Sequence, residues 1–435
     1  MLLKNLYLYC IIIIIKFLTY YGGIKMIILV INAGSSSLKY QLIDTETEIA
    51  YAKGLCEKIG KNDSAITHKN LTKGTSFQKV MVFPTHAEAM QAVIAALTDA
   101  EFGCISNMDD IDAIGHRVVH GGPYFSAPTI VTDEVKDTLK QCEIFAPLHT
   151  GPHITGINAC EKIIPGKPQV LIFDTAFHNT MSPAAYTYAL PYELCEKYSI
   201  RRYGAHGTSH RFVSEEMAKL LNKPVEETKI ITCHIGNGSS ISAVLGGKCI
   251  DTSMGLTPLA GIEMGTRCGD IDPSVVTFVM KYEKLSPDEM GDLMNNVSGF
   301  KGVSGVDSDS RALEKVIAAG PDHPSYERAK LAVDVLCHGI KKYIGAYSAL
   351  MNGVDAIVFT AGIGENNASL RKAVCENMEY LGISFDAKAN EDNAHVSCNT
   401  RISTPDSKVA VYVLPTNEEL VIARDTAATV AALKA

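Results

Sequence analysis

The chain has 435 residues, of which 46% are hydrophobic and 20% charged, the composition of a globular protein with room for two or three domains. Its formal net charge is −8, and no basic stripe interleaved with aromatic residues occurs, which argues against nucleic acid and anionic membranes as partners. Twelve cysteines are scattered without a C-x-x-C pair. We therefore expect neither a disulfide framework nor a structural zinc site, and a reducing cytoplasm as the location.

The first 25 residues differ from the rest of the chain. Their apolar run is interrupted by Lys16 and lacks a small-residue cleavage site, which makes a poor signal peptide and a short membrane span. We rank an artefactual upstream start above a membrane anchor, because Gly22 and Gly23, just before Met26, are what a purine-rich ribosome-binding site would encode. Residues 1–25 are predicted to be a non-native or disordered extension.

A strand, a small polar turn and a second strand are predicted over residues 26–42. The run from Met26 to Ile31 is almost wholly apolar, which is typical of a strand buried on both faces. After the turn, apolar residues recur with period two, so Ser37 and Lys39 share the opposite face. A hydroxyl and an ammonium beside backbone N–H donors suit a phosphate, although an ordinary Ser/Gly hairpin explains the same pattern. The apolar residues are Leu38, Tyr40 and Leu42.

Further strands are expected over residues 44–85, and apolar spacing predicts a helix from His86 to Ala100. Two buried strands then end on charged residues. Ile111 to Ile114 leads into a glycine-flanked segment with Arg117, which suits an anion at the edge of a sheet or forms a plain surface turn. Val170 to Phe173 ends on Asp174, where a catalytic or metal-associated carboxylate and a helix cap are both reasonable interpretations.

The middle of the chain repeats the opening pattern. A short strand, Lys229 to Cys233, precedes Gly238-Ser239-Ser240-Ile241, which resembles Ser35-Ser36-Ser37-Leu38. This similarity predicts that one supersecondary unit occurs twice, in two related lobes. Residues 201–210 gather cations, imidazoles and hydroxyls among glycines. Residues 251–273 form a long loop in which glycines flank Arg267, and a loop of that length is usually functional.

Nucleotide-type features follow towards the C-terminus. Apolar spacing predicts a long helix from Tyr326 to Met351. A strand at Ala356 to Phe359 then turns through Gly362-Ile363-Gly364 towards a helix near Ser369, an order that admits a nucleotide, although one Gly-x-Gly is weak support. The last strand spans 411–414 and is followed by a helix whose first turn contains Glu418, which the helix dipole alone explains.

Eight segments, in this order, resemble the acetate kinase (acetokinase) family. The resemblance covers essentially residues 26–435, and eight ordered motifs are far more specific than any one of them. The segments are INAGSSSLKY (31–40), GHRVVHGG (115–122), FDTAFH (173–178), RRYGAHGTSH (201–210), HIGNGSS (234–240), MGLTPL with MGTRCGDIDP (254–273), TAGIGEN (360–366) and PTNEEL (415–420).

The resemblance implies an α/β fold of the actin-like ATPase superfamily. Two ribonuclease-H-like lobes, each a mixed sheet flanked by helices, would enclose a cleft. The N-terminal lobe would be 26–178 plus about 420–435, and the C-terminal lobe, 179–419, would bind nucleotide and dimerise. The implied activity is reversible, Mg²⁺-dependent phosphoryl transfer from ATP to acetate, which gives acetyl phosphate and ADP in a homodimer. Mn²⁺ is the alternative metal.

The resemblance also assigns roles to individual residues. Asp174, His206 and Arg267 would be catalytic, and Asn32 and Glu418 would hold the metal. The acetate site would comprise Arg117, Val119, Leu148 and Pro258. The ATP contacts would be Lys39, His234, Ile235, Gly236, Asn237, Gly238, Asp309, Ser310, Arg311, Gly362, Ile363, Gly364, Glu365 and Asn366.

The chemistry of the reaction agrees with these roles. A carboxylic acid with a pKa of about 4 to 4.5 is already ionised at neutral pH, so the nucleophile needs no general base. Two anions must meet, and catalysis depends on positioning and on positive charge. Asp174 is therefore expected to orient an arginine or Mg²⁺ rather than to remove a proton.

Three departures from the family pattern concern substrate breadth. Residue 205 is Ala where the family usually has a Phe lining the methyl pocket, His149 lacks the usual following Asn-Pro, and Ala260 stands where an acid is common. A methylene in such a pocket is worth only about 1–3 kcal/mol, so a propionate or butyrate kinase is the nearest alternative. A non-catalytic actin-like nucleotide-switch protein is the alternative from another class, and it would hydrolyse ATP without dependence on a carboxylate.

Overall fold

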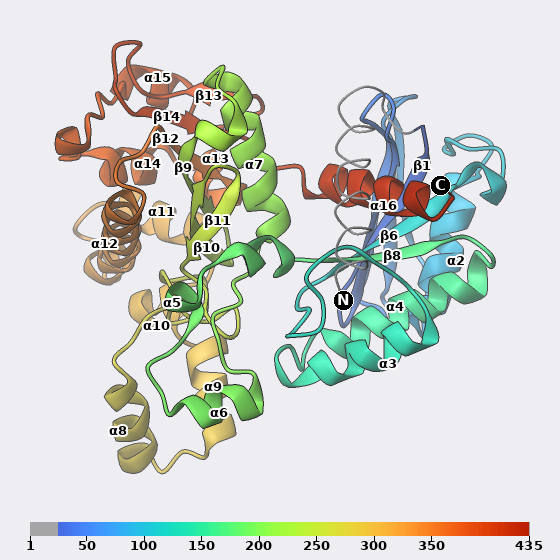
Figure 1. Ribbon diagram of the computed structural model, residues 1–435, viewed down its shortest axis with the longest axis horizontal. Coiled ribbons are helices and arrows are strands. Elements are labelled where there is room, and N and C mark those ends of the chain that lie inside the picture. Colours follow the sequence, from blue (N-terminus) through green and yellow to red (C-terminus); the bar gives the residue numbers. More distant parts are fainter. Residues whose placement is uncertain (1–24, 435) are drawn as a thin grey trace, which may run out of the picture. The chain divides into compact units, whose positions relative to one another are not determined.

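The computed structural model describes residues 25–434, which form two compact units (Figure 1). The first comprises residues 25–176 with 417–434, and the second is Phe177–Thr416. The predicted extension, 1–25, lies outside the described residues apart from Lys25. The division into lobes with separate functions, 26–178 with 420–435 and 179–419, stays a prediction.

The first unit is built on an eight-stranded sheet of order β5-β4-β3-β2-β1-β6-β8-β7. Strands β1 to β5 follow one another antiparallel, whereas β1, β6 and β8 run parallel. The predicted strand, turn and strand at 26–42 is the hairpin β1–β2. The strands are β1 (Ile27–Ala33), β2 (Ser37–Asp44), β3 (Ile49–Glu57), β4 (Ala65–Asn70), β5 (Thr75–Val80), β6 (Ala113–Val118), β7 (Thr129–Ile130) and β8 (Gln169–Phe173).

Helices α2 (His86–Leu97) and α4 (Thr150–Ile163) cover one face of this sheet. Leu29 and Ile31 of β1 pack there with Met90 of α2 and Cys160 of α4, because alternate residues of a strand face the same side. The shorter elements of the unit are α3 (Asp133–Gln141), η1 (Met108–Asp110) and η2 (Cys142–Ile144).

Helix α16 (Glu418–Lys434) crosses the other face against β1, β6 and β8 (Figure 1). Gly115 of β6 allows this contact, because a Cβ there would lie only 2.4 Å from Thr426 Oγ1 and 2.7 Å from Ile422 Cγ2. The approach places the first residue of α16, Glu418, beside the carboxyl end of β6.

The second unit repeats this topology. Its sheet has the order β11-β10-β9-β12-β14-β13, which corresponds to β3-β2-β1-β6-β8-β7 with each parallel and antiparallel pairing preserved. The predicted duplication and the α/β class with two ribonuclease-H-like lobes are confirmed. The strands are β9 (Lys229–Ile235), β10 (Ser239–Leu245), β11 (Lys248–Thr252), β12 (Ala356–Thr360), β13 (Thr400–Arg401) and β14 (Ala410–Val413).

This sheet also lies between helices. Helix α7 (Gly207–Leu220) packs on one face, and α12 (Tyr326–Leu350) and α14 (Ala368–Cys375) pack on the other. The remaining elements are η3 (Ala176–Thr180), α5 (Pro183–Tyr186), α6 (Tyr192–Tyr198), η4 (Val225–Glu227), α8 (Pro273–Glu283), α9 (Pro287–Asn296), α10 (Gly299–Ser304), α11 (Ser310–Ala318), α13 (Ala361–Asn366), η5 (Glu379–Leu381) and α15 (Ala387–Asp392).

Three details differ from the sequence prediction. Helix α2 ends at Leu97, three residues before Ala100, where Thr98 caps it through a bond from its N–H to the carbonyl of Ile94. Strand β6 continues to Val118, so Arg117 lies in the strand rather than in a loop. Helix α13 forms where only a turn was expected.

Two findings concern membrane-spanning helices and cysteines in the described part of the chain. Between residues 25 and 434 no helix has both the length and the apolar character that a membrane crossing requires. The cysteines in this part of the chain are all free thiols.

Candidate active site

The predicted residues of the first unit meet at one edge of its sheet. Asn32, Arg117 and Asp174 stand at or just beyond the carboxyl ends of β1, β6 and β8, which are adjacent parallel strands. Ile31 pairs with His116, and Arg117 pairs with Ile172, so the three side chains are nearly level. This edge is where open α/β sheets bind their ligands.

Arg117 is held by two carboxylates. Its Nη2 lies 2.6 Å from Oδ2 of Asp174, its Nε lies 3.3 Å from Oδ1 of the same residue, and Nε is also 3.7 Å from Oε2 of Glu418. Burial alone would lower the pKa of Arg117, but the two carboxylates outweigh burial and raise it. The Asp174 side chain is only 1% exposed, against 21% for Arg117. The guanidinium is therefore fixed in orientation while part of it still faces solvent.

The hairpin β1–β2 adds an amide and an ammonium to this edge. Asn32 pairs with Lys39 across the two strands. Lys39 is exposed on the face opposite Leu38 and Tyr40, as its alternation predicted. Asn32 is half-buried.

The donor set suits magnesium. No group of three His, Cys, Asp or Glu residues able to hold a metal occurs in residues 25–434. Mg²⁺ does not need such a group, because it keeps several waters and binds one or two protein carboxylates together with substrate phosphates. The amide oxygen of Asn32 and the carboxylate of Glu418 are hard oxygen ligands of this kind.

The two apolar residues assigned to the acetate site in this unit differ in burial. Val119 is 7% exposed, and its N–H donates to Nε2 of His153 over 3.2 Å. Burial, with a contribution from the charge of Arg117, lowers the pKa of His153 to about 3, so the imidazole is neutral and accepts this bond. Leu148 is 72% exposed.

In the second unit, His206 and Arg267 converge on Gly238. A Cβ at Gly238 would lie 3.5 Å from Nε2 of His206 and 3.4 Å from Nη1 of Arg267. The same nitrogen of Arg267 donates to the carbonyl of Pro258 over 3.0 Å, and burial lowers the pKa of the guanidinium. The missing side chain at position 238 leaves space in front of both nitrogens.

The backbone of His206 is strained. With φ at 58° and ψ at 25° it lies in the left-handed region, which costs a residue other than glycine on the order of 1 kcal/mol. Its ring stacks on His234, with the centroids 4.1 Å apart. His206 thus immediately precedes α7 and also contacts the strand that leads into the Gly238 turn.

The segments assigned to the nucleotide lie together. His234–Gly238 ends and follows β9, and Gly362–Asn366 follows β12, its parallel neighbour. A Cβ at Gly236 would lie 3.7 Å from that of Ala361, and one at Gly265 would meet both Oδ1 of Asn237 and the carbonyl of Ser308. The segments that contain residues 236–237, Ser308 and Ala361 therefore lie close together, next to the loop that contains Arg267.

Helix α13 is held by residues at its two ends. Oε1 of Glu365 accepts from the backbone N–H groups of Ala361 (2.8 Å) and Thr416 (3.3 Å), so this carboxylate caps its own helix. Among the described residues, no atom outside its chain neighbours and its own helix backbone lies within 4 Å of the Cβ position of Gly362, which leaves the start of the helix open. Ala361 has a φ of 66°, a second strained residue near the predicted site.

Arg371, which is fully buried, was not predicted from the sequence as a functional residue. Its Nη1 donates to the carbonyls of Gly364 and Glu365, and its other nitrogens donate to the side chain and carbonyl of Asn390 and to the carbonyl of Asn393. Burial lowers the pKa of Arg371 to about 10. A positive charge at the carboxyl end of α13 stabilises the helix dipole and fixes the segment. Only the fold reveals this role, because Arg371 stands in an ordinary helical stretch.

Residues 309–311 begin helix α11. Oδ1 of Asp309 accepts from the backbone N–H of Arg311 over 3.0 Å, and the two side chains form an ion pair of 2.5 Å. The side chain of Arg311 is 81% exposed. Ser310 lies in the first turn of α11, so the backbone N–H of Ser310 has no partner within the helix.

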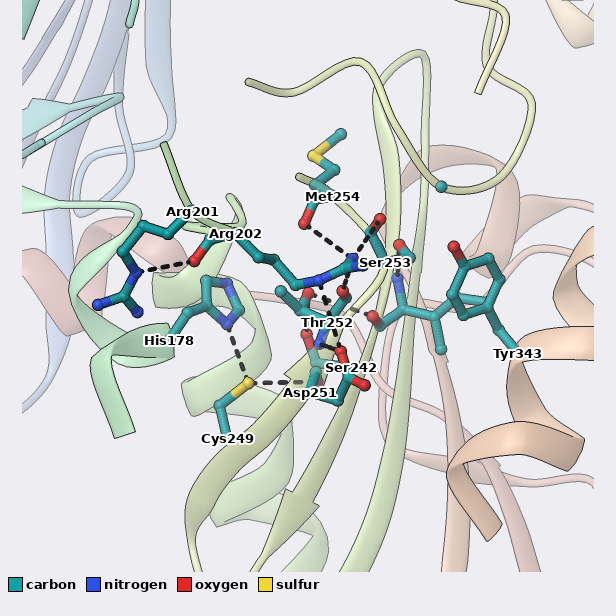
Figure 2. Close-up of polar contacts among 12 residues, drawn as sticks. His178, Arg201, Arg202, Ser242, Cys249, Asp251, Thr252, Ser253, Met254 and Tyr343 are labelled. Atoms are coloured by element: carbon teal, nitrogen blue, oxygen red, sulfur yellow. Dashed lines mark hydrogen bonds and ion pairs between the residues drawn. The ribbon is translucent and has the colours of Figure 1, made fainter. Parts of the chain in front are cut away.

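The loop that contains Arg267 is anchored at its start by Arg202. Figure 2 shows the guanidinium of Arg202 beside the backbone of Thr252, Ser253 and Met254, and Nη1 donates to the three carbonyls over 2.6, 3.2 and 3.4 Å. Arg202 Nε also lies 3.8 Å from Asp251 Oδ1. An irregular loop of this length needs such bonds to hold one conformation.

Ala205 lies in a small apolar cluster with Met254 and Met264, and all three are at most 3% exposed. Two long, unbranched side chains therefore occupy the surroundings of the alanine. Methionine adapts its shape more readily than an aromatic ring does.

Known proteins resemble the chain over nearly all of its length. A sequence profile of the acetokinase family matches residues 27–424. Acetate kinases of Methanosarcina thermophila and Halothermothrix orenii are 53% and 51% identical to it over 92% of this chain, and the matches cover 96% and 99% of theirs.

Solved structures agree with the sequences. An acetate kinase of Porphyromonas gingivalis is 45% identical, with a TM-score of 0.86 over 92% of this chain and 98% of that one. A propionate kinase of Francisella tularensis is 40% identical, with a TM-score of 0.84 over 92% and 99%. This protein therefore belongs to the acetokinase family.

Proposed function

We propose that the protein is an acetate kinase, which transfers the γ-phosphoryl group of ATP to acetate and releases acetyl phosphate and ADP. The observation that carries the proposal is the convergence of His206 and Arg267 on the open space beside Gly238. Gly238 lies in the turn that follows β9 of the second unit. Two cationic or hydrogen-bond-donating groups at one point are what a transferring phosphoryl group requires.

Arg117 binds the carboxylate of acetate. A guanidinium presents a planar pair of donors that matches a carboxylate, and the bonds to Asp174 fix the direction in which that pair points. Asp174 orients the arginine and takes no proton, because acetate is already ionised at neutral pH. The residues assigned to the acetate methyl group are Val119 and Leu148 of the first unit and Pro258 of the second.

The second unit binds ATP and stabilises the charge that develops in the transition state. The segments 234–238, 309–311 and 362–366 bind the nucleotide, with Lys39 as a further contact. His206 and Arg267 donate to the oxygens of the transferring group, and each donor of this kind accounts for roughly 10²- to 10³-fold in rate.

Asn32 and Glu418 hold a Mg²⁺ ion, with Mn²⁺ as a substitute. The ion, when bound, neutralises phosphate charge. We also propose a homodimer, formed through the second unit, and a cytoplasmic location, which the free thiols of the described residues support.

A second candidate is a short-chain acid kinase that prefers propionate or butyrate. The packing of Ala205 against Met254 and Met264 favours it, because two flexible side chains can move to admit another methylene. The resemblance to a propionate kinase structure points the same way.

Acyl hydroxamate formation from acetate, propionate and butyrate tests both candidates. We expect acetate to give a kcat/KM above that of propionate by about 10- to 200-fold, the range for one methylene. A preference for propionate would support the second candidate. ATP hydrolysis at a rate independent of all three acids would refute both and support a nucleotide-switch protein.

A further inference from the structure

A chain of four buried or half-buried polar side chains ends at His206. Strand alternation places Thr232 of β9 and Ser240 of β10 on the face that α7 covers, because their neighbours Ile231 and Ile241 pack on the opposite face against α12. His210 stands one turn after His206 on α7, so both rings face these strands. Thr232, Ser240 and His210 have no exposed surface.

The distances in this chain are those of strong hydrogen bonds. Oγ1 of Thr232 lies 2.7 Å from Nδ1 of His210. Nε2 of His210 lies 2.7 Å from Oγ of Ser240, and that oxygen lies 2.8 Å from Nδ1 of His206. Each link joins one proton donor to one acceptor, and every buried O–H along the chain needs an acceptor of its own.

His210 is neutral, because burial and the nearby His178 and His234 lower its pKa well below the ordinary value. A neutral imidazole has one N–H. If Ser240 accepted from both rings, its buried hydroxyl hydrogen would have no acceptor among these side chains, so Ser240 accepts from one ring and donates to the other. The two possible directions therefore give His206 opposite tautomers.

Thr232 selects the direction. Its hydroxyl can donate either to Nδ1 of His210 at 2.7 Å or to the carbonyl of Ser242 at 3.5 Å, which is at the limit of a hydrogen bond. If His210 donated to Thr232 instead, the buried Thr232 hydrogen would have only the Ser242 carbonyl to bond, so the direction in which Thr232 donates to His210 is favoured. His210 then donates from Nε2 to Ser240, and Ser240 donates to Nδ1 of His206.

We propose that Thr232, His210 and Ser240 act as positioning residues that fix His206 in the tautomer with its hydrogen on Nε2. That nitrogen faces the space beside Gly238 together with Nη1 of Arg267. His206 thus donates a hydrogen bond to the transferring phosphoryl group while it is itself uncharged. The opposite tautomer would present a lone pair to anionic oxygens.

This inference rests on the proposed function for the role of His206, but the tautomer can be observed without any turnover. ¹⁵N NMR of the full-length protein labelled at histidine distinguishes protonated from unprotonated ring nitrogens. In the unsubstituted protein we expect Nδ1 of His206 to be unprotonated and Nε2 protonated at neutral pH. The reverse assignment would overturn the proposal. This measurement needs no variant of the protein.

Variants test the relay itself. Thr232→Val keeps the shape of the side chain and removes the hydroxyl, so His206 is expected to populate both tautomers. We expect kcat to fall by roughly 10- to 10²-fold, less than for the loss of a whole donor, with the KM values for acetate and ATP unchanged. Thr232→Ser should restore both the spectrum and kcat.

Thr252→Val is the matched control. Thr252 is a fully buried threonine of the same sheet whose hydroxyl bonds to Ser242 outside the relay, so this variant should leave the His206 signals in place. An unchanged tautomer and kcat in Thr232→Val would overturn the proposal. If the expected tautomer is present but no acyl phosphate is made, the proposed function fails and the relay stands.

Discussion

Gly238→Ala is expected to slow catalysis without weakening the fold. The backbone φ of Gly238 is outside the left-handed region, and an added Cβ would lie 3.4 Å from Nη1 of Arg267 and 3.5 Å from Nε2 of His206, which are ordinary van der Waals contacts. Alanine therefore fits without strain, and the free energy of unfolding should change by well under about 1 kcal/mol. Since a full ~1 kcal/mol shifts the melting temperature by a few degrees, we expect the melting temperature to stay within about 1 °C.

The rate effect follows from the same two distances. A phosphoryl oxygen that accepts from both nitrogens sits about 2.9 Å from each, in the space next to a methyl carbon at 3.4 to 3.5 Å from them. The methyl displaces that oxygen by about 1 Å, and a misplacement of this size costs roughly 10²-fold. We expect kcat for acetyl hydroxamate formation to fall by that factor.

Gly291→Ala serves as the control for the same chemical change. Gly291 lies in α9, and within residues 25–434 no atom beyond its chain neighbours and its own helix backbone lies within 4 Å of its Cβ position. This variant should keep full activity and be slightly more stable, because alanine favours a helix by about 1 kcal/mol over glycine. A kcat in Gly238→Ala within twofold of the parent, about 0.4 kcal/mol in barrier, would refute the assignment of the reacting group to this space.

Three further predictions concern other parts of the structure. Arg117→Ala should lower kcat/KM for acetate by on the order of 10³-fold, and near-normal turnover would remove this arginine from the site. Arg371→Met leaves the carbonyls of α13 without their donor, so the KM for ATP should rise about tenfold, which corresponds to ~1.4 kcal/mol. The KM for acetate should stay constant. Equal changes in both KM values would indicate a general loss of structure. Burial lowers the pKa of His116 to about 4 and that of His153 to about 3, below the ~6.5 of an unfolded chain, so the unfolded state binds protons first as pH falls. For these two residues together, the free energy of unfolding should decline by up to about 2.7 kcal/mol per pH unit from pH 6.5 towards pH 4. Urea titrations that show no decline between pH 7 and 5 would contradict the burial of both rings in the neutral form.

The sequence predicted the elements whose signal is local. Alternation in β2 placed Lys39 on the correct face, and the similarity of the two Gly/Ser-rich turns predicted two sheets of one topology. Apolar spacing predicted α12 almost to the residue. Each of these features depends on the period of the chain or on a few neighbouring residues.

The features that were not predicted depend on distant residues. Strand β6 continues through His116 and Arg117 because Gln169 and Asp174, more than 50 positions later, bind their side chains. Helix α13 contains two glycines, which disfavour a helix, and it forms because its ends are held by Glu365 and Arg371. The relay behind His206 joins two strands and a helix, and no spacing in the sequence announces it.

In the proposed reaction, an oxygen atom of acetate attacks the γ-phosphorus of ATP. The most direct test incubates the full-length protein with [¹⁸O₂]acetate, unlabelled ATP and Mg²⁺, and follows acetyl phosphate by ³¹P NMR. We expect an isotope-shifted acetyl phosphate signal, because the labelled oxygen is then bonded to phosphorus, and we expect this signal to be lost in Arg117→Ala. Formation of ADP and inorganic phosphate at the same rate with and without acetate, and with no label on phosphorus, would contradict it.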